Sequence, residues 1–118
     1  MPVVRVGTED QVSLIERSEL YSAQNTPETL RFLRSHPQVI EVLEDAQEYV
    51  TEYFGPEARV VLTVRQDPAA HRKELIAKVV TDLPMEDAFA QLQAFGRDWF
   101  TREFVRVDGL ISFDVACL

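Results

Sequence analysis

The clearest chemical pattern in the chain is a series of carboxylates that recur at intervals of three and four. They are Glu41, Glu44, Asp45, Glu48 and Glu52. Side chains at these intervals lie along one side of an α-helix, so the sequence predicts an acidic stripe. A solvated helix face has this pattern, and so does a surface on which a basic protein docks, because complementary charge speeds association. No metal site is predicted, because no histidine joins the carboxylates.

Two smaller groups of residues offer different chemistry. Asp67, His71 and Arg72 lie in a segment between two predicted strands, where a histidine beside a carboxylate can act as a base or as a metal ligand. The same residues are also typical of a polar turn. Asp98 precedes Trp99, the lone tryptophan, which can line a binding pocket or belong to the core. Both groups are candidate ligand-binding sites.

Established catalytic motifs are absent from the sequence. It contains no glycine-rich phosphate loop, HExxH, CxxC pair or GxSxG, and it has only four glycines. We therefore predict no catalytic residue and no cofactor. The first functional hypothesis is a non-enzymatic interaction or accessory protein whose acidic helix face binds a basic partner. The alternative is a small ligand-binding domain or enzyme that uses the 67–73 loop or the Trp99 corner.

Composition limits the classes of partner and the cellular compartment that we expect for this protein. The chain has 118 residues and a net charge of -8. Residues 1–56 hold four arginines against ten acidic residues, whereas residues 57–118 hold eight basic against ten acidic residues. This balance argues against nucleic-acid binding, which depends on neutralising phosphates. No apolar run approaches the ~18 residues that span a bilayer, and the lone Cys117 suits a reducing compartment, so a cytoplasmic protein without membrane contact is expected.

Hydrophobic periodicity predicts the elements that position these groups. Alternating residues indicate two antiparallel strands, 59–65 and 74–81, joined by a hairpin loop. The period then changes to 3.6, with Leu92, Phe95 and Trp99 on the buried side of a helix. We predict this helix over residues 84–100, a connection over 102–108, a bend at Gly109 and a third strand over 110–116.

The N-terminal half is predicted to be helical from residue 26. Thr26 and Pro27 are typical of a helix start, and Pro37 separates this short helix from a second one over residues 37–54. Gly55 is predicted to end the second helix. Residues 1–25 are predicted to form a loosely packed segment, with an edge strand at 3–6, a helix from about residue 8 and a linker over 22–25.

Together these elements predict a single α+β domain over residues 1–118. If the third strand crosses over beside the second, the two are parallel. If it lies beside the first, every neighbouring pair is antiparallel, and we favour this order, 2-1-3, because the first strand is rich in valine. The second face of the sheet carries Val61, Ile76 and Val80, so it is covered by the N-terminal helices or forms a homodimer interface.

Four runs of the chain carry a resemblance to a known family, and they are residues 66–75, 81–88, 95–100 and 109–114. They resemble a family of small bacterial proteins that is frequent in cyanobacteria. That family has a V-x-D-P-E hairpin, an S-P-E-E-A helix start, an F-D-E-E-W-W helix end and a G-K-L-x-I-D-x-E strand. The likeness covers residues 26–116 and implies the fold without an activity. This sequence departs from the pattern at Leu83, at Gly96–Asp98 and at Phe100.

Overall fold

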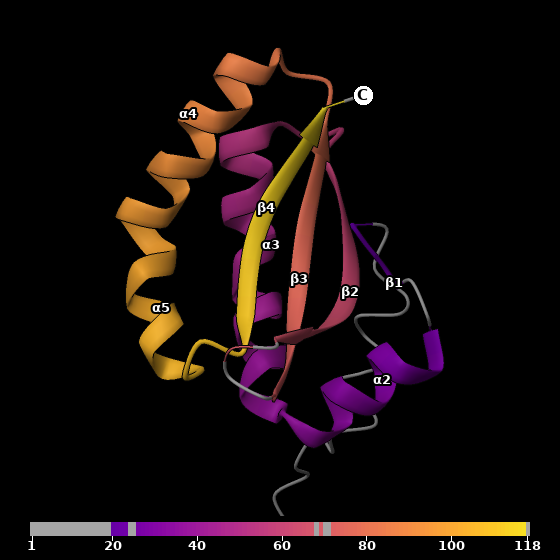
Figure 1. The fold of residues 1–118 in the computed structure, drawn as a ribbon. Helices are drawn as coiled ribbons and strands as arrows, with labels where there is room; N and C mark the ends of the chain where they lie inside the picture. The colour runs from indigo at the N-terminus through magenta and orange to yellow at the C-terminus, as the bar shows by residue number, and fades with distance from the viewer. Residues whose placement is uncertain (1–19, 24–25, 68, 70–71, 118) are drawn as a thin grey trace, which may run out of the picture.

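A computed structural model describes residues 20–23, 26–67, 69 and 72–117. These residues form a mixed sheet with helices (Figure 1), in agreement with the predicted α+β class. None of the described helices is both long and apolar enough to cross a membrane. In chain order the elements are β1 (Tyr21–Ala23), α2 (Thr26–Ser35), α3 (Pro37–Phe54), β2 (Arg59–Asp67), β3 (Arg72–Thr81), α4 (Met85–Phe95), the π-helical turn η1 (Gly96–Phe100), α5 (Thr101–Arg106) and β4 (Ile111–Cys117).

The predicted strand order is wrong. The sheet has the order β1-β2-β3-β4, and β4 lies beside β3, not beside β2. The central pair β2 and β3 is antiparallel, as predicted, whereas β1 pairs with β2 and β4 pairs with β3 in parallel. Parallel neighbours need a long crossover, and the helices from α4 to α5 provide it by returning the chain to the end of the sheet where β3 begins.

The structure also corrects the prediction for the N-terminal edge of the sheet. Ser22 and Ala23, predicted as linker, belong to β1, which pairs with Val61 and Leu62 of β2. A three-residue strand is too short to show an alternating period. Its first residue, Tyr21, is buried, and the Tyr21 hydroxyl donates a hydrogen bond to a backbone carbonyl of α3. The strand predicted at 3–6 and the helix predicted from residue 8 lie outside the described residues.

The helix boundaries mostly confirm the sequence signals. Pro37 is the first residue of α3, and His36 before it has the non-helical angles φ -135° and ψ 72°. Gly55 ends the helix with φ +96°. The predicted 84–100 helix continues through η1 and α5 to Arg106, so the predicted connection over 102–108 is wrong for most of its length. The turn η1 between α4 and α5 is π-helical. After Trp99 the buried-side positions at helical spacing are the charged residues Glu103 and Arg106, so a hydrophobic pattern does not show the continuation.

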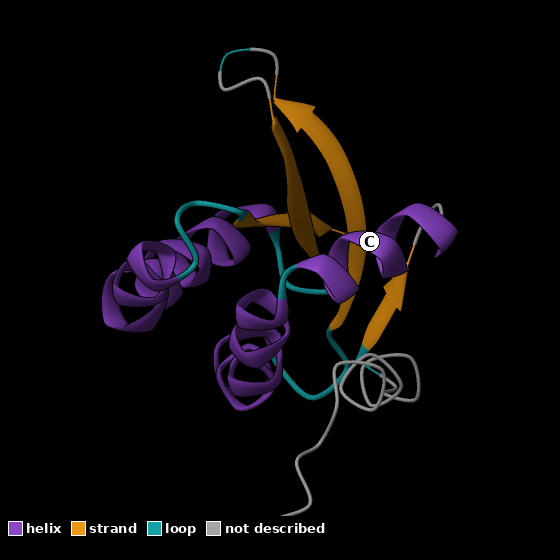
Figure 2. Ribbon diagram, turned by 90° about the horizontal axis from the view of Figure 1, so that it is seen from below, coloured by secondary structure: helices purple, strands orange, loops and turns teal. Residues whose placement is uncertain are grey.

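The core lies between one face of the sheet and the helices. Helices α3 and α4 cover that face (Figures 1 and 2), and the N-terminal helices therefore share it with the C-terminal one. Phe95 of α4 is completely buried and contacts rings from α3, from η1 and from β4. The main buried side chains of the sheet are Val60, Leu62, Val64, Leu75, Ala77, Val79 and Ile111.

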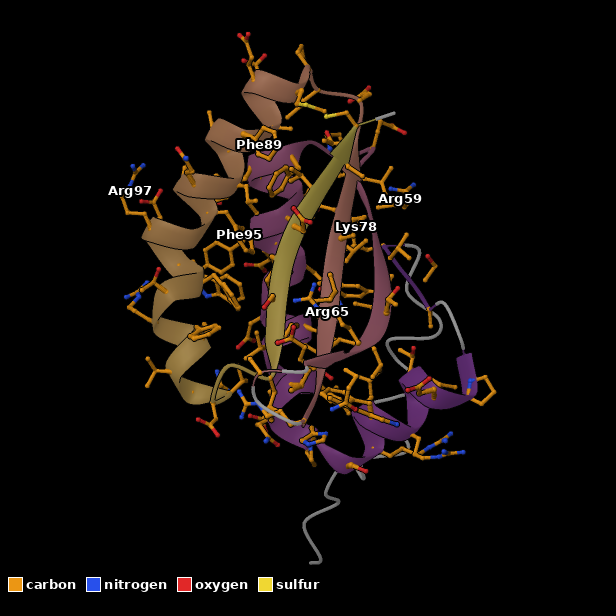
Figure 3. The ribbon with its side chains drawn as sticks, viewed as in Figure 1. Arg59, Arg65, Lys78, Phe89, Phe95 and Arg97 are labelled. Atoms are coloured by element: carbon orange, nitrogen blue, oxygen red, sulfur yellow. The ribbon has the colours of Figure 1, made fainter. Side chains whose placement is uncertain are left out.

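The opposite face of the sheet carries basic side chains between half-buried apolar ones. Arg59, Arg65 and Lys78 are exposed on it (Figure 3). Arg65 donates from Nε to Oε1 of Glu74 over 2.9 Å, so the buried carboxylate on this face is paired. The homodimer predicted through this face stays a prediction.

Candidate functional site

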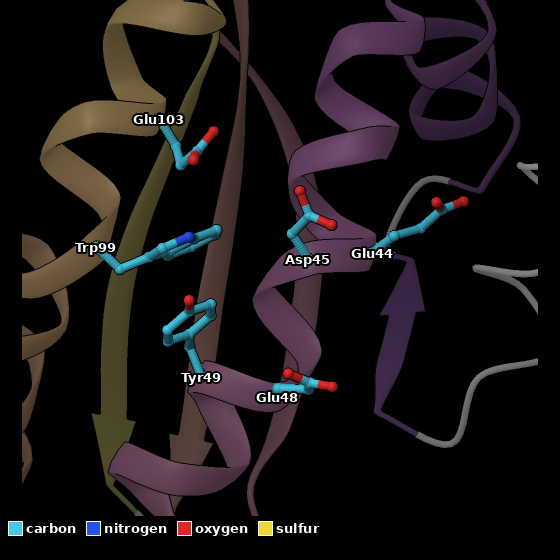
Figure 4. A pocket seen from close by; sticks show the side chains of 6 residues that line it. All are labelled: Glu44, Asp45, Glu48, Tyr49, Trp99 and Glu103. Atoms are coloured by element: carbon cyan, nitrogen blue, oxygen red, sulfur yellow. The ribbon is translucent and has the colours of Figure 1, made fainter.

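A hollow of about 400 Å³ opens between α3 and the helix formed by η1 and α5. Asp45 and Glu103 project into it from the two opposing helices, above the rings of Tyr49 and Trp99 (Figure 4). The hollow thus joins two groups that the sequence presented separately, the acidic stripe of α3 and the Trp99 corner. Its lining residues are Glu44, Asp45, Glu48, Tyr49, Trp99 and Glu103, and we call it the acidic hollow.

Two stacked aromatic rings form the inner wall of the acidic hollow. The rings of Tyr49 and Trp99 have centroids 4.7 Å apart and lie at 16° to each other. Trp99 is only 4% exposed, because its other side meets Phe95. The π-helical turn sets its position, and the Thr101 hydroxyl donates over 2.7 Å to the carbonyl of Gly96 within that turn. Trp99 therefore belongs to the core and also forms a wall of the hollow, while its role in binding stays a prediction.

The chain's own Arg106 binds at the rim of this surface. Its Nη2 donates to Oε2 of Glu41 over 2.7 Å, and its Nη1 donates to Oε2 of Glu103 over 3.0 Å. Nη1 also lies 3.6 Å from Oδ2 of Asp45. The hydrogen bonds to Glu41 and Glu103 raise the pKa of the guanidinium above its ordinary value. A guanidinium thus bridges α3 and α5 at one end of the acidic stripe.

Arg106 leaves most of the negative charge unneutralised. The stripe and Glu103 supply six carboxylates against this one guanidinium, a net charge of -5 for the seven side chains. Burial, and then the neighbouring carboxylates of Asp45 and Glu41, raise the pKa of Glu44. The Oε1 atom of Glu44 is buried without a hydrogen-bond partner among the described residues. The surface therefore carries electrostatic strain that an added cation would relieve.

Replacing Glu44 with glutamine tests this strain. The folded pKa of Glu44 is raised, so the native state binds more protons there and stability falls as pH rises above the unfolded pKa. We expect Glu44→Gln to melt at a higher temperature than the wild type near neutral pH, and the gain to shrink on acidification. Thermal melts across the acid range, with exposed Glu57→Gln as the control, check this. A gain that does not change with pH would contradict it.

Asp98, the other residue of the predicted corner, has a different role from Trp99. The Tyr53 hydroxyl donates to Oδ2 of Asp98 over 2.7 Å, and Arg97 donates to Oδ1 over 3.3 Å. These two hydrogen bonds, the one from Tyr53 first, lower the pKa of the carboxyl of Asp98. Asp98 therefore ties η1 to α3 and is not among the residues that line the acidic hollow.

None of the described residues of the hairpin loop lines this hollow. Asp67 and Arg72 are register partners at the ends of β2 and β3, and His71 lies outside the described residues. Arg72 reaches away from the loop, since its Nη2 donates over 2.7 Å to the carbonyl of Asp108. A ligand site at the 67–73 loop stays a prediction, and the structure gives Arg72 a role in holding the turn before β4.

Three contributors to the site were missed by the sequence reasoning. Tyr49 lies within the predicted second helix, 37–54, where the sequence gives it no role in a site, and Glu103 and Arg106 lie in the predicted connection, 102–108. The available signal was spacing, because Glu103 follows Trp99 by four residues and Arg106 follows Glu103 by three. Reading the helix onward from Trp99 would have placed both on its inner side.

No family model, curated protein or solved structure matches the chain. The resemblance to small cyanobacterial proteins therefore stays a prediction. Within the described part of the chain, no group of three histidine, cysteine or carboxylate side chains is arranged to hold a metal ion. What the acidic hollow can do chemically follows from its charge and its rings, which suit a cation that is partly planar or apolar.

Proposed function

We propose that the chain is an interaction protein that binds a basic segment of another protein in the acidic hollow. The observation that carries the proposal is the placement of Arg106. Its guanidinium is bound by Glu41 and Glu103, next to a hollow with room for further side chains and with Glu44 and Glu48 still unneutralised. A partner's arginine would meet the same kind of carboxylates that already bind Arg106.

The chemistry of the hollow favours arginine over lysine in the partner. A guanidinium is planar, so it can bind carboxylates through two parallel hydrogen bonds and lie against an aromatic ring. Glu44 and Glu48 offer the carboxylates that Arg106 does not contact, and Tyr49 with Trp99 offers the rings. Lysine presents a compact, strongly hydrated charge that gains less from the rings. The proposal contains no catalytic step, and the lining residues include no serine, threonine, cysteine or lysine nucleophile.

Neutralising the two free carboxylates tests the proposal. We expect Glu44→Gln/Glu48→Gln to weaken the binding of a short arginine-rich peptide by about tenfold, because each exposed ion pair contributes less than ~1 kcal/mol. Fluorescence anisotropy of the labelled peptide at low salt measures the affinity. The matched control Glu57→Gln/Asp82→Asn removes the same charge from exposed positions outside the hollow. Equal affinities for the two double variants would refute binding at the hollow.

A second candidate function is the binding of a small organic cation, such as a polyamine. The volume of the hollow, about 400 Å³, favours it, because small-molecule sites commonly measure ~300–1,000 Å³. A thermal-shift screen with polyamines distinguishes the candidates. A shift that disappears in Glu44→Gln/Glu48→Gln, without any binding of the arginine-rich peptide, would favour the small ligand over the protein partner.

A further inference from the structure

The outer edge of β4 has backbone groups that face away from β3, and among the described residues no further strand pairs with them. The carbonyl of Leu110 accepts a hydrogen bond from the backbone N–H of Leu75 over 2.7 Å, so it faces β3. Successive residues of a strand alternate in direction, and the backbone groups of Phe113, Val115 and Cys117 therefore face away from β3. The Val115 N–H confirms this direction, since it donates over 2.8 Å to Oδ1 of Asp114 at the edge. β4 ends the described sheet.

An exposed apolar flank lies next to this edge. Phe113 of β4 contacts the ring of Phe100 at 4.8 Å between centroids, and Phe100 contacts Phe104 at 5.9 Å. Phe104 is 44% exposed and Phe89 is 48% exposed. Figure 3 shows Phe89 projecting from α4 toward β4. The aromatic cluster thus continues from the core to the surface beside the last strand.

The helices extend farther than the sheet on this side. In Figures 1 and 2, α4 and α5 run alongside β4, beyond the outermost strand. A strand added to β4 would find hydrogen-bonding groups at the edge and apolar side chains of α4 and α5 on one face. Added strands need these two features, because main-chain hydrogen bonds give affinity and pockets for alternate side chains give specificity.

Asp114 defines the charge that the added strand should carry. It is the register partner of Lys78 on β3, yet no ion pair joins the two among the described residues. Its carboxylate instead turns along the strand to accept the Val115 N–H. Asp114 is also the only charged residue of β4. A basic side chain in the incoming strand beside Asp114 would neutralise it.

We propose that β4 is the docking edge for an extended segment of a partner protein, which adds to the sheet as a fifth strand. The segment alternates apolar side chains toward α4 and α5 with polar ones on the other face, and it places a basic residue next to Asp114. A second copy of this chain fits less well. Antiparallel pairing of two β4 strands around Asp114 would oppose like charges and bring both α4–α5 helices to the same side of the junction.

The experiment uses a short peptide that alternates valine with threonine and carries one central lysine, so that its attraction to the acidic hollow is small. We expect it to protect the amides of Phe113 and Cys117, which face away from β3, from hydrogen exchange, measured by NMR. Methylating the peptide nitrogens on one edge should abolish that protection, and replacing its lysine with glutamate should weaken binding about tenfold. Unchanged amide exchange, or equal binding of the methylated peptide, would overturn the proposal.

Val115→Pro is the matching change in the protein. Proline removes the backbone N–H of residue 115, which faces away from β3. Edge strands tolerate proline at such positions, so the variant should fold. Its binding of the peptide should fall about tenfold or more. Binding equal to that of the wild type would contradict the proposal, and the methylated peptide keeps the test valid if this variant does not fold. Glu44→Gln/Glu48→Gln should bind the peptide normally, which separates this edge from the acidic hollow. Concentration-dependent protection of the same amides without peptide would instead show self-pairing.

Discussion

Replacing Phe95 with alanine is expected to lower the free energy of unfolding by ~3–5 kcal/mol. Phe95 is completely buried, and its ring lies where α3, η1 and β4 converge on α4. Its centroid is 4.9 Å from that of Phe113 and 5.3 Å from that of Trp99. Removing the ring leaves a cavity that rigid neighbours on three elements cannot fill, so the cost should be near the upper part of the range for large core residues.

Phe89→Ala is the matched control for this loss. The two residues lie on the same helix and undergo the same chemical change, but Phe89 is 48% exposed. Its loss should cost no more than about 1 kcal/mol. Urea denaturation of both variants gives the comparison. Similar losses would show that the junction around Phe95 does not dominate stability, and the assignment of the core to this side of the sheet would then be wrong.

Reversing the charge of the acidic hollow is expected to have the largest effect on binding. Glu44→Lys/Glu48→Lys changes the local charge by four units and sets like charges against an arginine-rich peptide. We expect at least a ~100-fold loss of affinity, because both favourable pairs become repulsive. The variant should also lose the dependence of peptide affinity on salt that complementary charges produce.

The matched control for reversal is Glu57→Lys/Asp82→Lys. It gives the protein the same net charge while leaving the hollow intact, and both positions are exposed. Peptide affinity should fall much less in this control, because distant exposed charges are screened by salt. Equal losses in the two variants would mean that net charge alone attracts the peptide.

Much of the fold could be predicted because local signals agreed with each other. Proline before an apolar period marked the start of α3, and Gly55 marked its end. The alternating strands around the hairpin were equally clear. The strand order could not be predicted in this way, because β4 has the same alternation whether it lies beside β2 or beside β3. The crossover gives β4 the same direction in both arrangements, so the two differ only in which edge is open. β1 pairs with the outer edge of β2, and β4 therefore lies beside β3.

The candidate site was predictable only in part. The acidic stripe follows from spacing within α3, which depends on local geometry alone. The contact between Tyr49 and Trp99 joins residues 50 positions apart, so local spacing within either helix does not show it. Glu103 and Arg106 continue the spacing of Trp99 by four and three residues. They fall in the predicted connection because the predicted helix ends at residue 100, although Glu103 lines the acidic hollow and Arg106 lies at its rim.

The emission of Trp99 gives the most direct test of the central claim, that the acidic hollow binds a basic segment. Trp99 is the only tryptophan in the chain and lines the hollow, so titration with an unlabelled arginine-rich peptide reports on this place alone. We predict a saturable change in emission that weakens with added salt and disappears in Glu44→Lys/Glu48→Lys. Emission that stays constant while the peptide binds would place the interaction elsewhere and contradict the claim.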